Sequence, residues 1–134
     1  MNPVPAGDWQ IKVHAPRLIS VIDDEVEVLR ATSSLLRSCG FDVATYSSAE
    51  DFLHSPSNGR SACLISDVQM PGMSGIELLR QVQDLNRRIP VIILSRVDAT
   101  ETVIDAMRHG AFDYIVEPYD SMDLAARIHR AMRM

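Results

Sequence analysis

Acidic side chains follow two of the apolar segments in this chain, close to the point where each segment ends. Asp23 and Asp24 come directly after the apolar run 18–22, and Asp67 comes shortly after the apolar run 63–65. On neighbouring parallel strands, these carboxylates would meet at one edge of the sheet. Two ionised carboxylates roughly 5 Å apart repel each other by about 3 kcal/mol at an effective dielectric of about 20. A hard divalent cation, Mg²⁺ or Mn²⁺, removes that repulsion, so these residues predict a metal site.

A carboxylate that lies beside a bound divalent cation can attack a phosphoryl group and form an acyl phosphate. The competing explanation for paired acids after a strand is helix capping, because Asp24 and Glu25 would favour the positive end of the helix that follows. Asp23 and Asp24 alone do not decide between these explanations. The matching position of Asp67 at the end of another apolar run favours the cation site.

The elements that would position these acids form a regular alternation of short apolar runs and amphipathic stretches. The expected strands are residues 18–22, 42–46, 63–65, 91–95 and 114–116. The expected helices are residues 25–38, 48–55, 74–85, 100–109 and 121–133. Strands that are apolar throughout indicate a parallel sheet with helices on both faces. The sequence therefore predicts an α/β fold, a flavodoxin-like, doubly wound (βα)₅ three-layer sandwich with strand order 2-1-3-4-5.

Length and composition exclude several classes of protein. The 134 residues fit one domain, which we expect to span residues 17–134 after a flexible lead-in at residues 1–16. The formal net charge of −5 argues against nucleic-acid binding by the chain itself. The longest apolar runs are strand-sized and the N-terminus lacks a signal-peptide pattern, so we expect no membrane span. Cys39 and Cys63 lack metal-ligand or disulfide spacing, which predicts two buried, reduced thiols in a cytoplasmic protein.

Four short motifs contain or follow the acids and the strand ends. They are Asp23-Asp24-Glu25, Leu64-Ile65-Ser66-Asp67, Met70-Pro71-Gly72-Met73-Ser74-Gly75 and Pro90-Val91-Ile92-Ile93-Leu94-Ser95. In these motifs the chain resembles the bacterial response-regulator receiver domains of the CheY-like superfamily, and FixJ-like receivers in particular. The resemblance extends over about residues 17 to 133. The run Asp-x-x-Met-Pro-Gly-Met-x-Gly after a buried strand is its most specific feature.

The resemblance implies a two-component signalling protein rather than an enzyme, in which Asp67 accepts a phosphoryl group from a sensor histidine kinase. It also implies that Asp24, Asp67 and the backbone carbonyl of Gln69 hold Mg²⁺, while Asp23 reaches the ion through water. Any self-dephosphorylation would be incidental to the signalling role.

A second set of residues would convert phosphorylation into a change of surface. The resemblance places Ser95 at the switch hydroxyl and Tyr114 at the aromatic whose rotamer follows phosphorylation. A hydroxyl at a strand end can swing toward a phosphoryl oxygen, and a nearby aromatic ring then gains or loses room. The competing explanations are a turn residue for Ser95 and a partly buried core aromatic for Tyr114. The resemblance implies that the surface of residues 100–109, 114–116 and 121–133 forms a homodimer or docks an output domain.

The chain departs from the family at two positions. Glu117 precedes Pro118 where the family has a lysine, and the only lysine of the chain is Lys12. A glutamate there adds a fourth carboxylate and repels a phosphoryl dianion. Arg96 follows Ser95 where the family usually has a small residue. We expect Arg96 either to pair with Glu117 or the phosphoryl group, as a substitute cation, or to point to solvent.

Two further functions compete with phosphoryl acceptance. Because of Glu117 and Arg96, the chain could be an atypical pseudo-receiver that acts as a phosphorylation-independent protein docking module. A metal-dependent phosphatase or a nucleotide-binding flavodoxin relative is disfavoured. Asp67 has no second acid two residues further on, and no glycine-rich phosphate loop follows the first strand.

Overall fold

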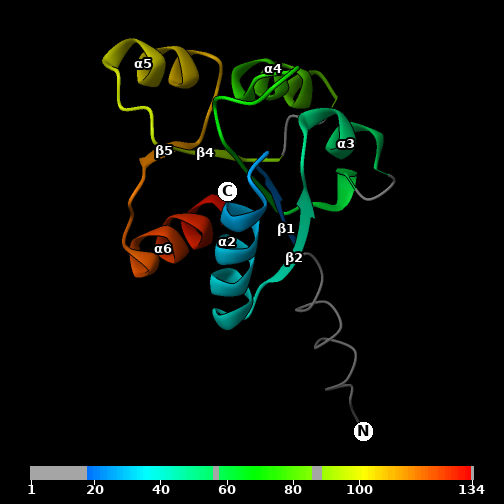
Figure 1. The fold of residues 1–134 in the computed structure, drawn as a ribbon, viewed down its shortest axis with the longest axis vertical. Coiled ribbons are helices and arrows are strands. Elements are labelled where there is room, and N and C mark those ends of the chain that lie inside the picture. The colour runs from blue at the N-terminus through cyan, green and yellow to red at the C-terminus, as the bar shows by residue number, and fades with distance from the viewer. Residues whose placement is uncertain (1–17, 56–57, 86–88, 134) are drawn as a thin grey trace, which may run out of the picture.

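A computed structural model describes residues 18–55, 58–85 and 89–133 of the chain (Figure 1), so the predicted lead-in at residues 1–16 lies outside the described residues. Its five-stranded sheet has the order β2-β1-β3-β4-β5, and every neighbouring pair is parallel. The strands are β1 (Leu18–Ile22), β2 (Asp42–Tyr46), β3 (Cys63–Ser66), β4 (Val91–Ser95) and β5 (Asp113–Val116). The helices are α2 (Val26–Ser38), α3 (Ala49–His54), α4 (Gly75–Leu85), α5 (Thr100–Arg108) and α6 (Ser121–Met132), with a 3₁₀ turn, η1, at Asn58–Arg60. The predicted fold and strand order are confirmed.

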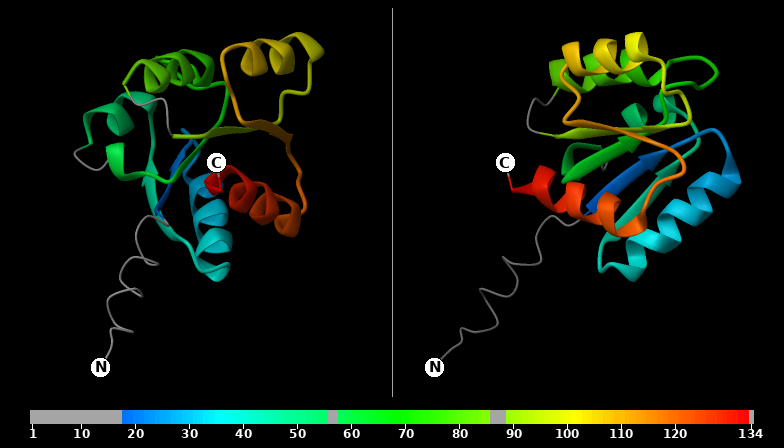
Figure 2. Two further views of the ribbon diagram at one scale, coloured as in Figure 1. Left: turned by 180° about the vertical axis from the view of Figure 1, so that it is seen from behind. Right: turned by 90° about the vertical axis from the view of Figure 1, so that its left-hand side faces the viewer.

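Helices cover both faces of the sheet. Helices α3, α4 and α5 lie on one face and α2 and α6 on the other, as Figures 1 and 2 show. Successive side chains of a strand point to opposite faces, so each central strand contributes to two apolar layers. In β3, for example, Leu64 packs in the layer beneath α3, α4 and α5, whereas Ile65 packs beneath α2 and α6. This two-sided burial explains why the central strands are mostly apolar, with the buried serines Ser20, Ser66 and Ser95 as their only polar residues.

The register of the strands aligns the residues that follow them. Ile22 of β1 is the partner of Ser66 of β3, so Asp23 and Asp67 leave the sheet side by side. The backbone N–H of Asp67 donates to the carbonyl of Ile22 at 3.2 Å, which extends this pairing by one residue. The carboxyl ends of β1 and β3 therefore bring their acids to one edge, as the sequence predicts.

Polar side chains begin several of the helices. Ser48 accepts a hydrogen bond from the backbone N–H of Asp51 at 3.0 Å, and Ser74 accepts one from Glu77 at 3.2 Å. Both interactions are the capping contacts expected for Ser or Thr before a helix. These caps start α3 and α4 close to the sheet edge that carries Asp67.

One expectation about the cysteines is wrong. Cys63 is buried in β3, and burial raises the pKa of its thiol to about 12, as expected for a thiol without a role in reactivity. Cys39 is exposed instead of buried, because it belongs to the exposed turn that follows the last residue of α2. Its apolar neighbours Leu36 and Phe41 point into the core, whereas the turn itself faces solvent.

In the part of the chain that the structure describes, no helix has both the length and the apolar character that crossing a membrane requires.

Gly75 is the position where a single methyl group should disturb the loop between β3 and α4. A Cβ atom at Gly75 would overlap the carbonyl oxygen of Asp67 and approach the backbone of Val68. We expect Gly75→Ala to lower the free energy of unfolding by about 2 to 3 kcal/mol, measured by urea denaturation. Gly59→Ala is the matched control, because nothing lies within 4 Å of a Cβ there. Equal stabilities of the two variants would contradict the predicted backbone contact.

Candidate functional site

Three carboxylates converge where β1 and β3 end. One carboxylate oxygen from each of Asp23, Asp24 and Asp67 lies within 4.8 Å of the others. Asp23 is buried, Asp24 is exposed, and Asp67 is intermediate between them. The structure thus brings together the three aspartates that the sequence predicts as a metal site, and Asp67 stays open to solvent.

Asp23 is the buried member of the cluster, with only 5% of its surface exposed. Burial, above all, raises the pKa of Asp23 from 3.8 to about 6. A hydrogen bond from the backbone N–H of Glu25 to Oδ1 at 2.9 Å lowers the pKa, and the charges of Asp67 and Asp24 raise it further. The carboxylate of Asp23 is therefore ionised at neutral pH only at a cost in free energy.

Helix capping by Asp24 and Glu25 is the competing explanation for the acids at the end of β1. Glu25 is the residue before α2, and its side chain makes no capping hydrogen bond. The side chain that contacts this turn is that of Asp23, which accepts from the Glu25 N–H. Asp23 thus belongs to both the acidic cluster and the start of α2.

The donor set fits a hard divalent cation. Three carboxylates offer oxygen ligands in a space that one ion can span, and such ligands suit Mg²⁺ or Mn²⁺. Within the described residues, the ion pairs of Arg96 go to Glu25 and Glu117 rather than to the three aspartates. Among the described residues, no ion pair joins a basic side chain to any of the three aspartates.

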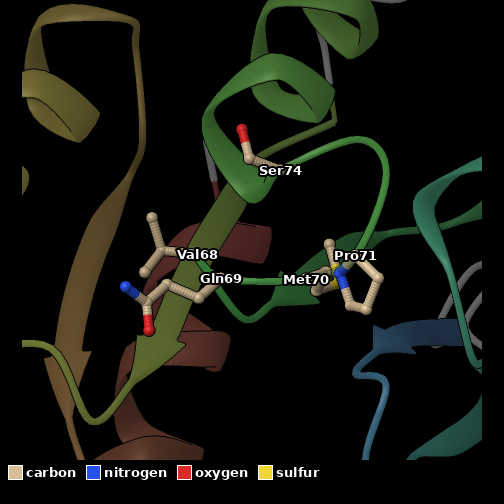
Figure 3. Close-up of a pocket in the computed structure, with 5 residues that line it drawn as sticks. All are labelled: Val68, Gln69, Met70, Pro71 and Ser74. Atoms are coloured by element: carbon tan, nitrogen blue, oxygen red, sulfur yellow. The ribbon is translucent and has the colours of Figure 1, made fainter.

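The loop between β3 and α4 folds back over Asp67. The backbone N–H of Gln69 donates to Oδ1 of Asp67 at 3.3 Å, which keeps residue 69 next to the carboxylate. Figure 3 shows the side chain of Gln69 extending away from Met70 and Pro71. These three residues, with Val68 and Ser74, line a shallow cavity of about 460 Å³. The backbone of Gln69 thus lies next to the Asp67 carboxylate.

Glu50 of α3 holds the same loop from outside, and sequence reasoning missed it. Its Oε2 accepts a hydrogen bond from the backbone N–H of Met73 at 3.1 Å. Gly72, next to Met73, has a φ of 76° and passes so close to this carboxylate that a Cβ would lie 2.9 Å from it. The glycine in the Pro71-Gly72-Met73 run is the sequence signal for such a tight turn, but nothing in the sequence indicates that Glu50 is its partner.

Ser95 and Tyr114 are connected through the backbone of Val97. Ser95 is buried, and its Oγ accepts a hydrogen bond from the N–H of Val97 at 3.1 Å. The hydroxyl of Tyr114 donates to the carbonyl of Val97 at 2.6 Å. Burial, above all, raises the pKa of Tyr114, whose ring lies in the layer beneath α3, α4 and α5. Sequence reasoning identified both side chains but not the residue between them.

Arg96 and Glu117 lie together at the ends of β4 and β5. Ser95 and Val116 are register partners, so the residues that follow them are neighbours. The Nε atom of Arg96 lies 3.8 Å from Oε1 of Glu117, and its Nη2 lies 3.9 Å from Oε1 of Glu25. Burial raises the pKa of Glu117, while the charge of Arg96 opposes that rise. The pairing of Arg96 with Glu117 is present, and the guanidinium is also exposed, so both sequence expectations for Arg96 hold in part.

Comparison with known proteins identifies the family. The response regulator receiver domain model matches residues 19–129, and the chain belongs to this family. It is 37% identical over 117 residues to the response regulator protein TodT of Pseudomonas putida, and this alignment covers 87% of this chain and 52% of TodT. It is 35% identical over 113 residues to the transcriptional regulatory protein FixJ of Rhizobium meliloti, covering 84% of this chain and 55% of FixJ. The chain thus spans about half the length of these relatives.

A solved structure supports the same assignment. The receiver domain protein from Clostridium thermocellum superposes with a TM-score of 0.81 at 32% sequence identity. The alignment covers 87% of this chain and 94% of that one. The sheet order and the helices on both faces are therefore those of the CheY-like receiver fold, as the sequence resemblance indicates.

The raised pKa of Asp23 predicts a pH-dependent stability in the absence of divalent cations. The unfolded carboxyl loses its proton near its ordinary pKa of 3.8, whereas the folded one keeps it until about 6. Stability should therefore fall as the pH rises between these values, by up to about 3 kcal/mol. Asp23→Asn removes this loss, because an amide does not ionise in this pH range. The amide oxygen can still accept the hydrogen bond from the Glu25 N–H. We expect the stability advantage of Asp23→Asn to grow as the pH rises through this range, measured by urea denaturation in a metal-free buffer.

A control separates this effect from the titration of other groups. Asp84→Asn changes an exposed aspartate of α4, outside the acidic cluster, and is the matched control. A constant difference between Asp23→Asn and the wild type across the same pH range would contradict the prediction.

Proposed function

We propose that this chain is the phosphoryl-accepting receiver of a two-component response regulator. In this proposal Asp67 accepts a phosphoryl group from a sensor histidine kinase in a Mg²⁺-dependent reaction, and the domain then switches a partner-binding surface. The observation that carries the proposal is the convergence of Asp23, Asp24 and Asp67 at the ends of β1 and β3. Asp67 follows β3, the strand that lies between β1 and β4, and its side chain is partly exposed to solvent.

The chemistry requires one nucleophilic oxygen and a charge-neutralising partner. A carboxylate oxygen of Asp67 forms a bond to phosphorus, the phosphorus–nitrogen bond of the phosphohistidine breaks, and the imidazole leaves with the electron pair. The hydrogen bond from the Gln69 N–H orients the Asp67 carboxylate for this attack. Asp24, Asp67 and the Gln69 carbonyl would hold the divalent cation, with Asp23 reaching it through water. When bound, the cation neutralises the negative charge on the phosphoryl oxygens.

The contacts of Ser95 and Tyr114 support a switch. If the Ser95 hydroxyl turns to donate to a phosphoryl oxygen, its hydrogen bond from the Val97 N–H is lost. A shift of Val97 then displaces the acceptor of the Tyr114 hydroxyl. Phosphorylation would thus shift the equilibrium between two arrangements of Ser95, Val97 and Tyr114, one with these hydrogen bonds and one without them.

The surface proposed to respond lies on α5, β5 and α6, the fourth helix, fifth strand and fifth helix of the receiver. It carries four large apolar side chains that are substantially exposed, namely Ile104, Met107, Val116 and Met122. Exposed apolar side chains on neighbouring elements favour a protein partner. The proposed partner is either a second copy of the chain or an output domain of the same response regulator.

The central test is the binding of beryllofluoride, a mimic of the phosphoryl group. We expect saturable beryllofluoride binding that requires Mg²⁺ and shifts the backbone amide signals around Asp67 in NMR spectra. Asp67→Asn should abolish the binding, because the anion loses its carboxylate ligand. Asp84→Asn, at an exposed position of α4, should leave the binding unchanged. Mg²⁺ binding without any response to beryllofluoride would contradict phosphoryl acceptance and favour the phosphorylation-independent docking module.

The switch makes a separate prediction. In Ser95→Ala, beryllofluoride should still bind, but the ring signals of Tyr114 should no longer shift upon binding, because the hydroxyl that contacts both Val97 and Tyr114 is absent. Ser34→Ala, at an exposed serine of α2, is the control and should respond as the wild type does. An unchanged Tyr114 response in Ser95→Ala would show that the coupling does not pass through Ser95.

A further inference from the structure

We propose that Arg96 is a mobile phosphoryl ligand, held between Glu25 and Glu117 and transferred to the phosphoryl group when Asp67 is modified. This inference rests on the proposed function and adds a cation to a site whose three aspartates form no ion pair with a basic side chain among the described residues. It also assigns a role to Glu25, which holds the resting position of Arg96 together with Glu117.

The Arg96–Glu25 ion pair joins residues that follow the two strands on either side of β3. Arg96 follows β4 and Glu25 lies between β1 and α2, while β3 separates β1 from β4 in the sheet. The Arg96–Glu25 ion pair therefore spans the end of β3, which is the strand that Asp67 follows. The guanidinium therefore lies at the same edge of the sheet as Asp67, between residues that follow β1 and β5.

The resting contacts of Arg96 are weak enough to be exchanged. Its ion-pair distances are 3.8 and 3.9 Å, and 71% of its side chain is exposed. Arg127 shows what a fixed arginine looks like in the same protein, because its Nη1 lies 2.9 Å from Asp113 and its Nη2 lies 3.1 Å from Asp123. Long, exposed ion pairs contribute little to stability, so leaving them costs little.

A phosphoryl group is the stronger partner for this guanidinium. It carries about two negative charges at neutral pH and offers oxygens that match the planar fork of arginine donors. Glu25 and Glu117 each carry a single charge and share one guanidinium between them. The geometry therefore predicts transfer of Arg96 toward the modified Asp67.

The position of Arg96 also joins charge recognition to the switch. Arg96 lies between Ser95, whose hydroxyl would contact the phosphoryl group, and Val97, whose carbonyl binds Tyr114. A phosphoryl group that binds Arg96 and Ser95 together pulls on consecutive residues of one loop. Glu117 acts against this movement, since it competes for Arg96 and repels the phosphoryl dianion.

A double-mutant cycle tests the inference, with beryllofluoride and Mg²⁺ as the probe. The four proteins are the wild type, Arg96→Ala, Glu117→Gln and the double variant. We expect Arg96→Ala to weaken beryllofluoride binding about tenfold, as for loss of a charge-assisted hydrogen bond, both in the wild type and in Glu117→Gln. Glu117→Gln alone should strengthen binding. Arg80→Ala, which removes an exposed arginine of α4, is the control and should not change the affinity.

The cycle separates ligand binding from simple charge neutralisation. If Arg96 serves only to neutralise Glu117, its removal will have no effect once Glu117 is replaced by glutamine, and that result would overturn the inference. Unchanged affinity of Arg96→Ala in both backgrounds would overturn it as well. A second readout is the NMR signal of the Arg96 Nε–H group, which should shift when beryllofluoride binds to the wild type.

The outcomes also distinguish this inference from the proposed function. Mg²⁺-dependent beryllofluoride binding that requires Asp67 but not Arg96 would retain the proposed function and overturn the inference alone. Absence of beryllofluoride binding in the wild type would overturn both. Circular dichroism and urea denaturation of each variant show whether it is folded, so loss of binding by unfolding is recognised.

Discussion

The site depends on the forced approach of three like charges at one edge of the sheet. The pairing of Ile22 with Ser66 brings Asp23 and Asp67 together, and the burial of Asp23 makes its ionisation costly. Two apolar layers, one on each face of the sheet, hold the strands in that register against the repulsion. The fold thus maintains a cluster that is unfavourable by itself and that a divalent cation would relieve. Rigid strands make this possible, because a flexible loop would let the carboxylates separate.

Much of the fold and the acidic cluster could be predicted from the sequence, for local reasons. The uninterrupted apolar runs indicate buried parallel strands, and a parallel sheet must place all of its strand ends with the same polarity at one edge. That argument brings Asp23, Asp24 and Asp67 together without any knowledge of side-chain positions. The helix starts at Ser48 and Ser74 were also predictable, because a capping serine contacts a residue only a few positions away.

The remaining parts of the site depend on contacts between distant residues, which no local pattern records. Glu50 binds the backbone of Met73 across two elements, so its carboxylate could equally have been a solvent-exposed charge in the first turn of α3. The exposure of Cys39 depends on the orientation of one turn after α2, which its apolar neighbours do not reveal. The ion pair between Arg96 and Glu25 crosses the end of a strand, and the spacing of the two residues in the sequence gives no sign of it.

The link between Ser95 and Tyr114 has a consequence for how such a domain can change during evolution. Both hydrogen bonds to residue 97 use main-chain atoms, the N–H on one side and the carbonyl on the other. Any residue except proline supplies both groups, so the valine side chain can be exchanged without breaking the connection. The side chain at this position is therefore free to adapt to the packing around it, while the path that connects the strand end with the aromatic ring persists. The contacts at residue 97 therefore belong to the backbone, and sequence comparison of residue 97 alone would not reveal them.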